Sequence, residues 1–349
     1  MLQRTTYWLS QNARVGWFLA QYLLGQRIGR SRAPRRPPKT QAPAASTSGP
    51  GVRELLADLR ALLAQDLKNI EAGRYALPHD IIKDPRELVQ AAWRYFEDLP
   101  AVVARSHCDA FDEVARLRPD DLAAFPKYYR RNFHYQTDGY LSDRSAQIYD
   151  HQVEVLFMGS ADAMRRQALV PLGAFLDGRR VTETRMLDIG CGTGRFLTFV
   201  KDNYPRLPVV ALDLSPNYLA EARTQLKPWT DVGFIQGLAE TLPFADASFD
   251  VASSVYLLHE VPEEIRRRIL AEAARVLRPG GRLILVDSLQ QGDRPYFDVL
   301  IKNFPRSFHE PFYAGYARTN FIALGASVGV HHRSSERAFL SKVITFDKQ

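Results

Sequence analysis

Apolar residues recur with two different periods along the chain, and the change between the two periods divides it into parts. From residue 53 to about residue 130 the apolar positions follow helical spacing, as in Leu55, Leu59 and Leu62. From about residue 185 onward, short apolar runs alternate with segments that predict amphipathic helices, the longest from Pro262 to Leu277. The apolar runs predict strands near 185–190, 208–214, 232–236, 249–255, 282–287, 326–332 and 338–346. This alternation predicts an α/β fold with a parallel sheet that helices cover on both faces.

Residues 1–30 form an amphipathic, basic N-terminal segment that combines aromatic residues, leucines and arginines, and no Asp or Glu occurs before Glu54. Its uninterrupted apolar part is too short to span a bilayer. The composition suits a helix in an anionic membrane interface, an organellar transit peptide, or a partner-binding, partly disordered arm. Residues 31–52 are rich in Pro, Ala and Ser and predict a flexible linker. We expect a cytoplasmic protein with peripheral membrane contact through residues 1–30, or an organellar protein if residues 1–50 are a transit peptide.

Composition narrows the class of protein. The chain has 349 residues with 46% hydrophobic and 24% charged content, which is ordinary for a globular protein. Its two cysteines, Cys108 and Cys191, give no disulfide framework and no metal-binding spacing. The net charge of +7 is local, because residues 1–53 carry nine of the 46 basic residues and none of the 39 acidic ones. We therefore expect a small-molecule substrate and no nucleic-acid partner, and the oligomeric state stays open.

The sequence LDIGCGTG, from Leu187 to Gly194, lies where the first strand of the predicted sheet ends, and Asp213 ends the next apolar run. A strand, a glycine turn, a helix and an acid after a second strand indicate a site for a nucleotide ribose. Dinucleotide-binding enzymes usually show G-x-G-x-x-G, whereas this turn reads G-x-G-x-G after Asp188. A G-x-x-x-x-G-K-[ST] phosphate loop is absent from the sequence.

These motifs resemble class I S-adenosylmethionine-dependent methyltransferases, and the resemblance covers about residues 166–349. Leu242-Pro243-Phe244 and Ser248-Phe249-Asp250 resemble the LPF and SFD segments of the ubiquinone/menaquinone-type enzymes, and RPGG at residues 278–281 matches their turn before the fifth strand. The resemblance implies a Rossmann-like, seven-stranded, mostly parallel sheet with an antiparallel C-terminal hairpin, and S-adenosylmethionine as cofactor. Residues 53–165 would then form a helical extension and an active-site lid.

The resemblance also implies roles for individual residues. Gly190, Gly192 and Gly194 would let the backbone approach the cofactor, Asp188 would accept from its α-amino group, and Asp213 would accept from both ribose hydroxyls. Leu238 departs from the family pattern, since related enzymes often have an Asp there for the adenine amino group. Further predicted cofactor contacts are Cys191, Thr193, Leu214, Ala239, Glu240 and Ser254, with either the backbone of residues 239–240 or the Glu240 side chain replacing that Asp.

Two aromatic regions and one strand end are candidates for catalysis and acceptor binding. His259, after the fourth strand, is a candidate general base, and Tyr256 is a second catalytic candidate. The sequence supports equally well a structural role for His259, as a histidine packed at the start of a helix. A [DNS]-P-P-[YFW] sequence is absent, which disfavours methylation of nucleobase or glutamine amino groups. Candidate substrate residues are Tyr135, Tyr140 and Tyr149 in the lid and His309 and Tyr313 near the C-terminus, all of which also suit ordinary packing. The sequence shows no metal-binding cluster, so we expect no metal site.

The leading hypothesis is therefore transfer of a methyl group from S-adenosylmethionine to a small, hydrophobic acceptor that is a quinone, an isoprenoid or lipid-like. The alternative is a non-catalytic S-adenosylmethionine-binding module that retains the fold, which Leu238 alone supports. A nicotinamide oxidoreductase is a third reading, and the glycine spacing disfavours it.

Overall fold

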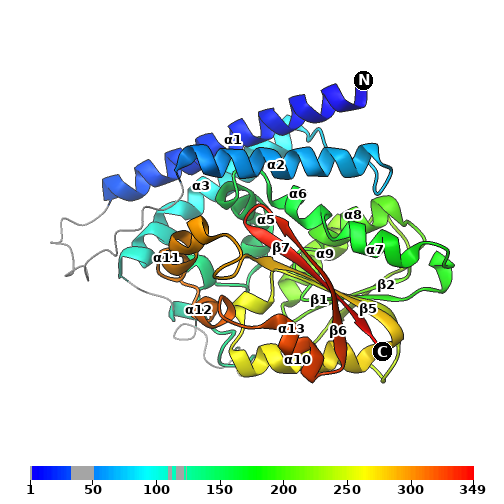
Figure 1. Ribbon diagram of the computed structural model, residues 1–349. Coiled ribbons are helices and arrows are strands. Elements are labelled where there is room, and N and C mark those ends of the chain that lie inside the picture. The colour runs from blue at the N-terminus through cyan, green and yellow to red at the C-terminus, as the bar shows by residue number, and fades with distance from the viewer. Residues whose placement is uncertain (1, 33–50, 109–111, 115–121, 123) are drawn as a thin grey trace.

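The computed structural model describes residues 2–32, 51–108, 112–114, 122 and 124–349, so most of the predicted linker at 31–52 lies outside the described residues. Within the described part, the strands form one seven-stranded sheet in the order β3-β2-β1-β4-β5-β7-β6 (Figure 1). The strands are β1 (Met186–Ile189), β2 (Val209–Asp213), β3 (Val232–Gln236), β4 (Phe249–Val255), β5 (Leu277–Ser288), β6 (Val330–Ala338) and β7 (Ser341–Lys348). Strands β1 to β5 pair in parallel, and β7 is antiparallel to both β5 and β6. The predicted fold class is confirmed.

The central strands are where the apolar runs predict them, because all four residues of β1 and most of β4 are buried. The predicted antiparallel C-terminal hairpin is present, but its predicted limits were wrong: β6 begins at Val330 rather than near residue 326, and helix α13 (Phe321–Ser327) precedes it. Strand β6 lies at the sheet edge, and only its first and last residues are fully buried. An edge strand with so polar a sequence gives no apolar run from which its limits can be predicted.

Helices cover both faces of the sheet. They are α5 (Asp143–Leu156), α6 (Ala161–Arg166), α7 (Leu169–Leu176), α8 (Arg195–Asn203), α9 (Pro216–Gln225), α10 (Glu263–Val276), α11 (Asp298–Phe308), α12 (Tyr313–Tyr316) and α13. Short 3₁₀ turns are η1 (Phe133–Tyr135), η2 (Val181–Glu183), η3 (Leu258–Glu260) and η4 (Pro295–Phe297). Ser215 caps helix α9, since its hydroxyl accepts from the Tyr218 amide at 3.2 Å, and Pro216 occupies the first turn.

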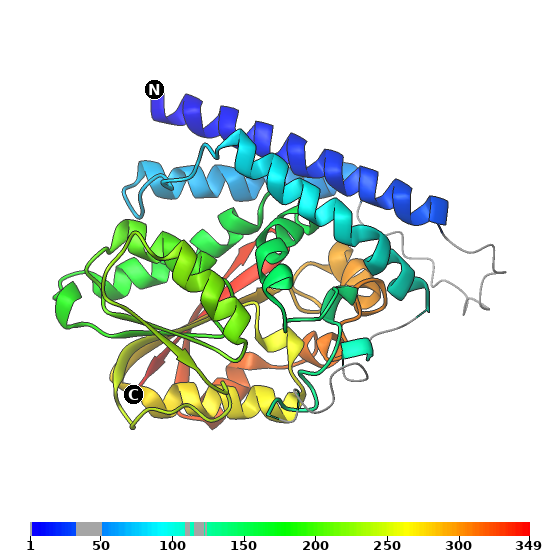
Figure 2. The same ribbon diagram turned by 180° about the vertical axis from the view of Figure 1, so that it is seen from behind.

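A helical layer lies outside the sheet domain and consists of α1 (Leu2–Arg32), α2 (Val52–Glu71) and α3 (Pro85–Cys108). Figure 1 and Figure 2 both show these three helices along one side of the molecule. Helix α1 contacts α2, α3 and α5, while α2 contacts α6. The leucine stripe of α2 is buried, and α3 starts at the predicted Asp84-Pro85 step. None of the described helices combines the length and apolar character that a membrane span requires.

Helix α1 is docked on the protein and is not a disordered arm over residues 2–32. Tyr7 is fully buried, and its hydroxyl donates to Asp66 Oδ2 at 2.8 Å. On the other side of the helix Leu9, Leu23 and Leu24 stay exposed. Membrane contact through this helix stays a prediction.

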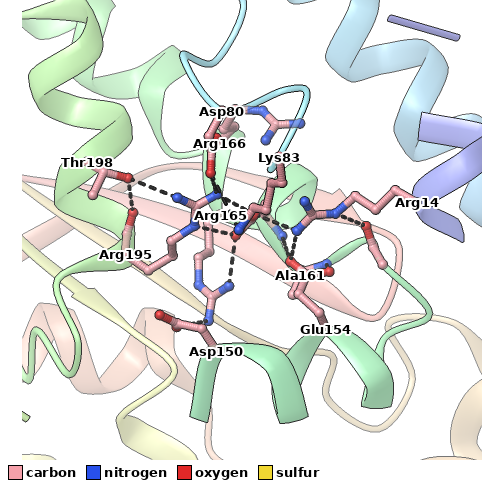
Figure 3. Close-up of polar contacts among 12 residues, drawn as sticks. Arg14, Asp80, Lys83, Asp150, Glu154, Ala161, Arg165, Arg166, Arg195 and Thr198 are labelled. Atoms are coloured by element: carbon pink, nitrogen blue, oxygen red, sulfur yellow. Dashed lines mark hydrogen bonds and ion pairs between the residues drawn. The ribbon is translucent and has the colours of Figure 1, made fainter. Parts of the chain in front are cut away.

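A buried network of charged side chains joins α1 to the sheet domain (Figure 3). The Arg14 guanidinium contacts Asp162 Oδ2 at 2.6 Å and Glu154 Oε1 at 2.8 Å. Arg195, at the start of α8, contacts the same Asp162 oxygen at 2.6 Å and also Asp80 Oδ2 at 2.6 Å. Buried charges are retained only where partners neutralise them, so this network fixes the position of α1 relative to the catalytic domain.

Candidate functional site

The predicted cofactor residues meet at the carboxyl ends of β1, β2 and β4. The strand order reverses between β1 and β4, and open α/β sheets bind ligands at such a reversal. A cavity lies there, which we call the glycine-turn cavity. Its lining includes Asp188, Gly190, Cys191, Gly192, Thr193, Asp213, Leu214, Ala239, Glu240, Tyr140, Tyr149 and Tyr256.

The three glycines of the turn all have positive φ angles, 70° at Gly190, 55° at Gly192 and 78° at Gly194. Only glycine adopts such angles without strain, which explains the glycines in the LDIGCGTG sequence. A Cβ at Gly190 would approach Leu257 to 2.9 Å, and one at Gly194 would approach Leu226 to 2.9 Å. A Cβ at Gly192 would meet no atom within 4 Å. Gly192 therefore presents bare backbone to the open cavity, while Gly194 serves packing of α8 on α9.

The two predicted acids lie on adjacent strands and differ in their bonding. Asp188 is buried and accepts from the Ser253 hydroxyl at 2.5 Å, and burial raises the pKa of its carboxyl to about 7. Asp213 accepts from the Gly192 amide at 2.8 Å through Oδ2 and from the Ser215 amide at 2.8 Å through Oδ1. Burial raises the pKa of Asp213 to about 6, although these amide bonds oppose the rise. Each Asp213 oxygen keeps a further lone pair, so the carboxylate holds the turn and still offers acceptors to the cavity.

The far end of the cavity contains Glu240, in the segment where Leu238 departs from the family pattern. Glu240 is buried, and its Oε1 accepts from the Tyr128 hydroxyl at 2.6 Å. Among the described residues its Oε2 has no hydrogen-bond partner. A buried carboxylate oxygen without a partner is costly, which suits an acceptor kept for a ligand amino group. Ser254 is also buried but is not part of the cavity lining, and its neighbour Ser253 binds Asp188 instead.

The segment before β1 covers the glycine-turn cavity with aromatic side chains. Tyr140 stacks on Phe133 with ring centroids 5.2 Å apart, and it meets Tyr149 and Tyr218 edge-on. The Tyr140 hydroxyl donates to Glu260 Oε1 at 2.6 Å. The aromatic side chains around this opening are Tyr128, Tyr129, Phe133, Tyr140, Tyr149 and Tyr218. Their location is that expected of a lid.

A second cavity adjoins the first and shares the lining residues Tyr149, Tyr256 and Glu260 with it. We call it the apolar cavity, because most of its lining is aliphatic or aromatic. Its lining comes from α1, α2, α5, α11, α12, the end of β5 and the region after β4, and includes Tyr22, Gln26, Leu55, Val153, Leu156, Phe157, Met158, Leu289, Phe297, Ile301, Phe304, Tyr313 and Leu340. Tyr313, one of the predicted substrate residues, therefore lies on the apolar cavity.

The two predicted catalytic residues differ in location, because Tyr256 lines both cavities and His259 lines only the apolar cavity. The Tyr256 ring lines both cavities, and its hydroxyl lies 3.0 Å from Ser341 Oγ on β7. His259 lines the apolar cavity, with Nδ1 2.6 Å from Asp287 Oδ1. Burial disfavours the charged imidazole, but the Asp287 carboxylate outweighs burial and raises the pKa of His259 to about 10. A ring protonated at neutral pH donates rather than accepts a proton, so this geometry disfavours His259 as the general base.

The other predicted substrate residues lie further from the cofactor residues. Tyr135 is buried beside a third cavity near α1 and α3, and its ring centroid lies 5.5 Å from that of His309. His309 ends α11 with a φ of 48° and is not part of the lining of either cavity defined above. Tyr135 and His309 therefore line neither the glycine-turn cavity nor the apolar cavity.

Sequence reasoning missed a buried polar cluster at the boundary of the two cavities. His134 Nδ1 lies 3.1 Å from Glu310 Oε1, and His134 Nε2 lies 3.5 Å from Glu260 Oε1. Glu310 is fully buried, and burial raises its pKa to about 7 although His134 and His259 oppose the rise. These residues come from η1, η3 and the segment after α11, and no spacing in the sequence relates them. The sequence indicates a functional role only for the polar residues after β4, and among them it favours His259 rather than Glu260.

Comparison with known proteins agrees with this geometry. A family model described as a methyltransferase domain matches residues 186–281, from β1 into β5. A demethylmenaquinone methyltransferase of Thermotoga maritima is 32% identical over 183 residues, which are 52% of this chain and 75% of the relative. A second demethylmenaquinone methyltransferase, of Renibacterium salmoninarum, is 35% identical over 49% of this chain and 60% of its own length.

A malonyl-[acyl-carrier protein] O-methyltransferase of Xylella fastidiosa is 35% identical over 40% of this chain and 44% of the relative. Among solved structures, a protein of Pyrococcus horikoshii is 20% identical, covers 65% of this chain and 100% of that chain, and has a TM-score of 0.41. The family assignment depends on the sequence matches, and the observed strand order agrees with it. This chain belongs to the class I S-adenosylmethionine-dependent methyltransferases and resembles their ubiquinone/menaquinone-type domain.

Proposed function

We propose that the protein transfers the methyl group of S-adenosylmethionine, bound in the glycine-turn cavity, to a small apolar acceptor bound in the apolar cavity. The observation that carries this proposal is that the two cavities are neighbours, since Tyr149, Tyr256 and Glu260 line both of them. Methyl transfer requires cofactor and acceptor to meet in line without an intervening wall. The shared residues mark the place where a methyl group would pass from one cavity to the other.

The glycine-turn cavity fits the cofactor on several independent observations. Gly192 leaves open space at its Cα, and Glu240 Oε2 is a buried acceptor without a partner among the described residues. Asp213 would accept from the ribose hydroxyls, Glu240 from the adenine amino group, and Asp188 from the methionine amino group. When bound, S-adenosylmethionine would supply a sulfonium-activated methyl group, and the rings of Tyr140 and Tyr149 suit a neighbouring positive charge.

The apolar cavity determines the class of acceptor. Its aliphatic and aromatic lining favours a hydrophobic molecule, and the polar residues His134, His259 and Glu260 also line it, Glu260 being shared with the glycine-turn cavity. The names of two relatives specify demethylmenaquinone, and that of a third specifies malonyl-[acyl-carrier protein]. We infer a quinone, isoprenoid or lipid-like acceptor whose reacting end is polar.

In this proposal the residues of the chain orient the reactants and exclude water. The lid rings close one side of the glycine-turn cavity, and the buried ion network of α1 holds the outer wall of the apolar cavity, to which α1 contributes Tyr22 and Gln26. Water excluded from both cavities cannot compete with the acceptor or stabilise the sulfonium. The substrate would then enter as a small molecule, with membrane contact through residues 1–30 as a further proposal.

Titration calorimetry of the full chain with S-adenosylmethionine and S-adenosylhomocysteine tests the cofactor half. We expect binding by the wild type, and Asp213→Asn should weaken it by about tenfold to a hundredfold, since a hydrogen bond to a charged group contributes about 1.5–3 kcal/mol. Asp246→Asn, at an acid with 79% of its side chain exposed, is the matched control and should bind normally. Absent wild-type binding, or equal binding by Asp213→Asn, would refute the cofactor assignment.

Incubation of the enzyme and S-adenosylmethionine with a lipid extract of cells tests the acceptor half. We expect mass spectrometry to find an apolar metabolite that gains one methylene unit. Cofactor binding without any methylated product would favour the non-catalytic binding module instead.

A further inference from the structure

We infer that His134, Glu260 and Glu310 form a binding site for a divalent transition-metal ion at the boundary of the two cavities. One donor atom from each residue lies within 4.8 Å of the other two. One imidazole nitrogen and two carboxylate oxygens form a mixed donor set that suits Zn²⁺ or Mn²⁺ better than Mg²⁺, which prefers oxygen ligands and bound water. Binding of the ion stands on these contacts alone, while its role toward the acceptor rests on the proposed function.

Burial makes this cluster unlike a chance group of surface acids. The exposed fractions of the His134, Glu260 and Glu310 side chains are 11%, 11% and 0%. Among the described residues Glu310 Oε2 has no hydrogen-bond partner, and Glu310 Oε1 faces His134 Nδ1 at 3.1 Å. Buried carboxylates are normally paired, hydrogen-bonded or bound to a metal. A cation at this point would satisfy the Glu310 oxygens that the protein leaves open.

The surroundings of the cluster resemble the outer shell of a metal site. The Tyr140 hydroxyl donates to Glu260 Oε1 at 2.6 Å and fixes the orientation of that carboxylate. Donors on one tetrahedral ion with bonds of about 2.0–2.2 Å lie roughly 3.3–3.5 Å apart. Since the three donor atoms lie within 4.8 Å of one another, the side chains would need to draw together by no more than about 1.5 Å. The ion would replace the ion pairs that His134 now makes with the two glutamates.

The location of the cluster suits a metal ion that binds the acceptor. His134 and Glu260 line the apolar cavity, and Glu260 also lines the glycine-turn cavity. Three protein donors leave at least one coordination position of the ion open. We expect a hydroxyl or carbonyl oxygen of the acceptor to take that position, which would hold its reacting end beside the transferable methyl group. The acceptor would then be an oxygenated apolar molecule such as an enol, a phenol or a hydroxyquinone.

Equilibrium dialysis of the metal-stripped full chain against Zn²⁺, Mn²⁺ and Mg²⁺ tests the site. We expect one Zn²⁺ or Mn²⁺ per chain, and weakening of at least about tenfold in Glu310→Gln and in His134→Gln. His79→Gln is the matched control, because His79 also pairs with a carboxylate, at 2.7 Å, but is about half exposed. Weak binding equal in wild type and variants, or no stoichiometric binding by the wild type, would overturn the inference.

Two further measurements separate loss of the ion from loss of the fold or of the proposed function. Glu310 does not line the glycine-turn cavity, so Glu310→Gln should bind S-adenosylmethionine as the wild type does. The absorption spectrum of Co²⁺ added to the wild type should show nitrogen and oxygen coordination, whatever the stability of the variants, and a spectrum equal to aqueous Co²⁺ would count against the site. If the ion binds but S-adenosylmethionine does not, the proposed function fails and the ion site stands.

Discussion

Lowering the pH should weaken the docking of helix α1, because His151 is held neutral where α1 meets α5. His151 Nε2 lies 2.8 Å from Gln21 Oε1, and its ring packs against Phe18 with centroids 5.2 Å apart. Burial, and then the nearby charges of Lys83 and Arg14, lower the pKa of His151 from 6.5 to about 4. His151 is therefore protonated at a lower pH in the folded protein than in the unfolded chain.

The sign and size of this effect follow from linkage. A folded-state pKa below the unfolded value contributes stability that is present above pH 6.5 and is lost as the pH falls toward 4. At about pH 5 the histidine is protonated in the unfolded chain and still neutral in the folded protein. This pH lies about 1.5 units below the unfolded pKa of 6.5. At about 1.36 kcal/mol per unit, the free energy of unfolding should fall by about 2 kcal/mol between pH 8 and pH 5.

Other groups titrate in the same range, so the assay compares the wild type with His151→Gln at each pH. Glutamine keeps a hydrogen-bonding group near Gln21 but does not titrate. We expect the difference in unfolding free energy between the two proteins, measured in urea, to change by about 2 kcal/mol from pH 8 to pH 5. Hydrogen exchange over residues 16–24 should show faster opening of α1 in the wild type at low pH. A difference that stays constant across this range would refute the reasoning.

Three further predictions concern the helical layer and the glycine turn. Arg14→Met should destabilise the fold by about 3–5 kcal/mol in thermal or urea unfolding, because two buried carboxylates lose a cation, whereas Arg4→Met, at a 4.0 Å exposed pair, should change stability by less than about 1 kcal/mol. Gly190→Ala should lose cofactor binding in calorimetry, because a Cβ there would strain a φ of 70° and lie 2.9 Å from Leu257, which would shift the turn. Gly178→Ala is the control, since it has the same φ but no atom within 4 Å of the added Cβ, and it should bind normally. Leu23→Glu, at a side chain 59% exposed, should release the protein from anionic vesicles in a flotation assay if α1 contacts membranes, and unchanged or absent vesicle binding would contradict that contact.

The cofactor side of the site could be predicted because its chemistry is local in the sequence. Residues 188–194 form one turn, and the acid at residue 213 follows at the end of the neighbouring strand. Glycines with positive φ and an acid at a strand end are requirements of the backbone, so the amino-acid types reveal the geometry. For the missing acid at Leu238 the sequence offers either the backbone of residues 239–240 or the Glu240 side chain, and the role of Glu240 stays a prediction. Its Oε2, without a hydrogen-bond partner among the described residues, makes the side chain available for that role.

The acceptor side could not be predicted, because it depends on contacts between distant segments. His134, Glu260 and Glu310 belong to three different parts of the chain. From the sequence alone, each of them could equally be a solvent-exposed polar side chain. His259 gave the opposite signal: its unperturbed pKa suits a base at neutral pH, but the tertiary contact with Asp287 raises that pKa to about 10. Electrostatic partners of this kind are set by packing and leave no pattern in the sequence.

Helix α1 shows why composition alone gave three readings of one segment. Its arginines and aromatic residues suit a membrane surface, yet Arg14 and Tyr7 are used internally, and Tyr22 and Gln26 face the cavities under α1. The family match ends well short of this helix, since it spans residues 186–281. The methyltransferase domain would therefore supply the cofactor site, while the N-terminal helices would complete the wall that selects the acceptor. Removing residues 1–50 to test membrane contact would also open the apolar cavity, so substitution of exposed leucines is the cleaner experiment.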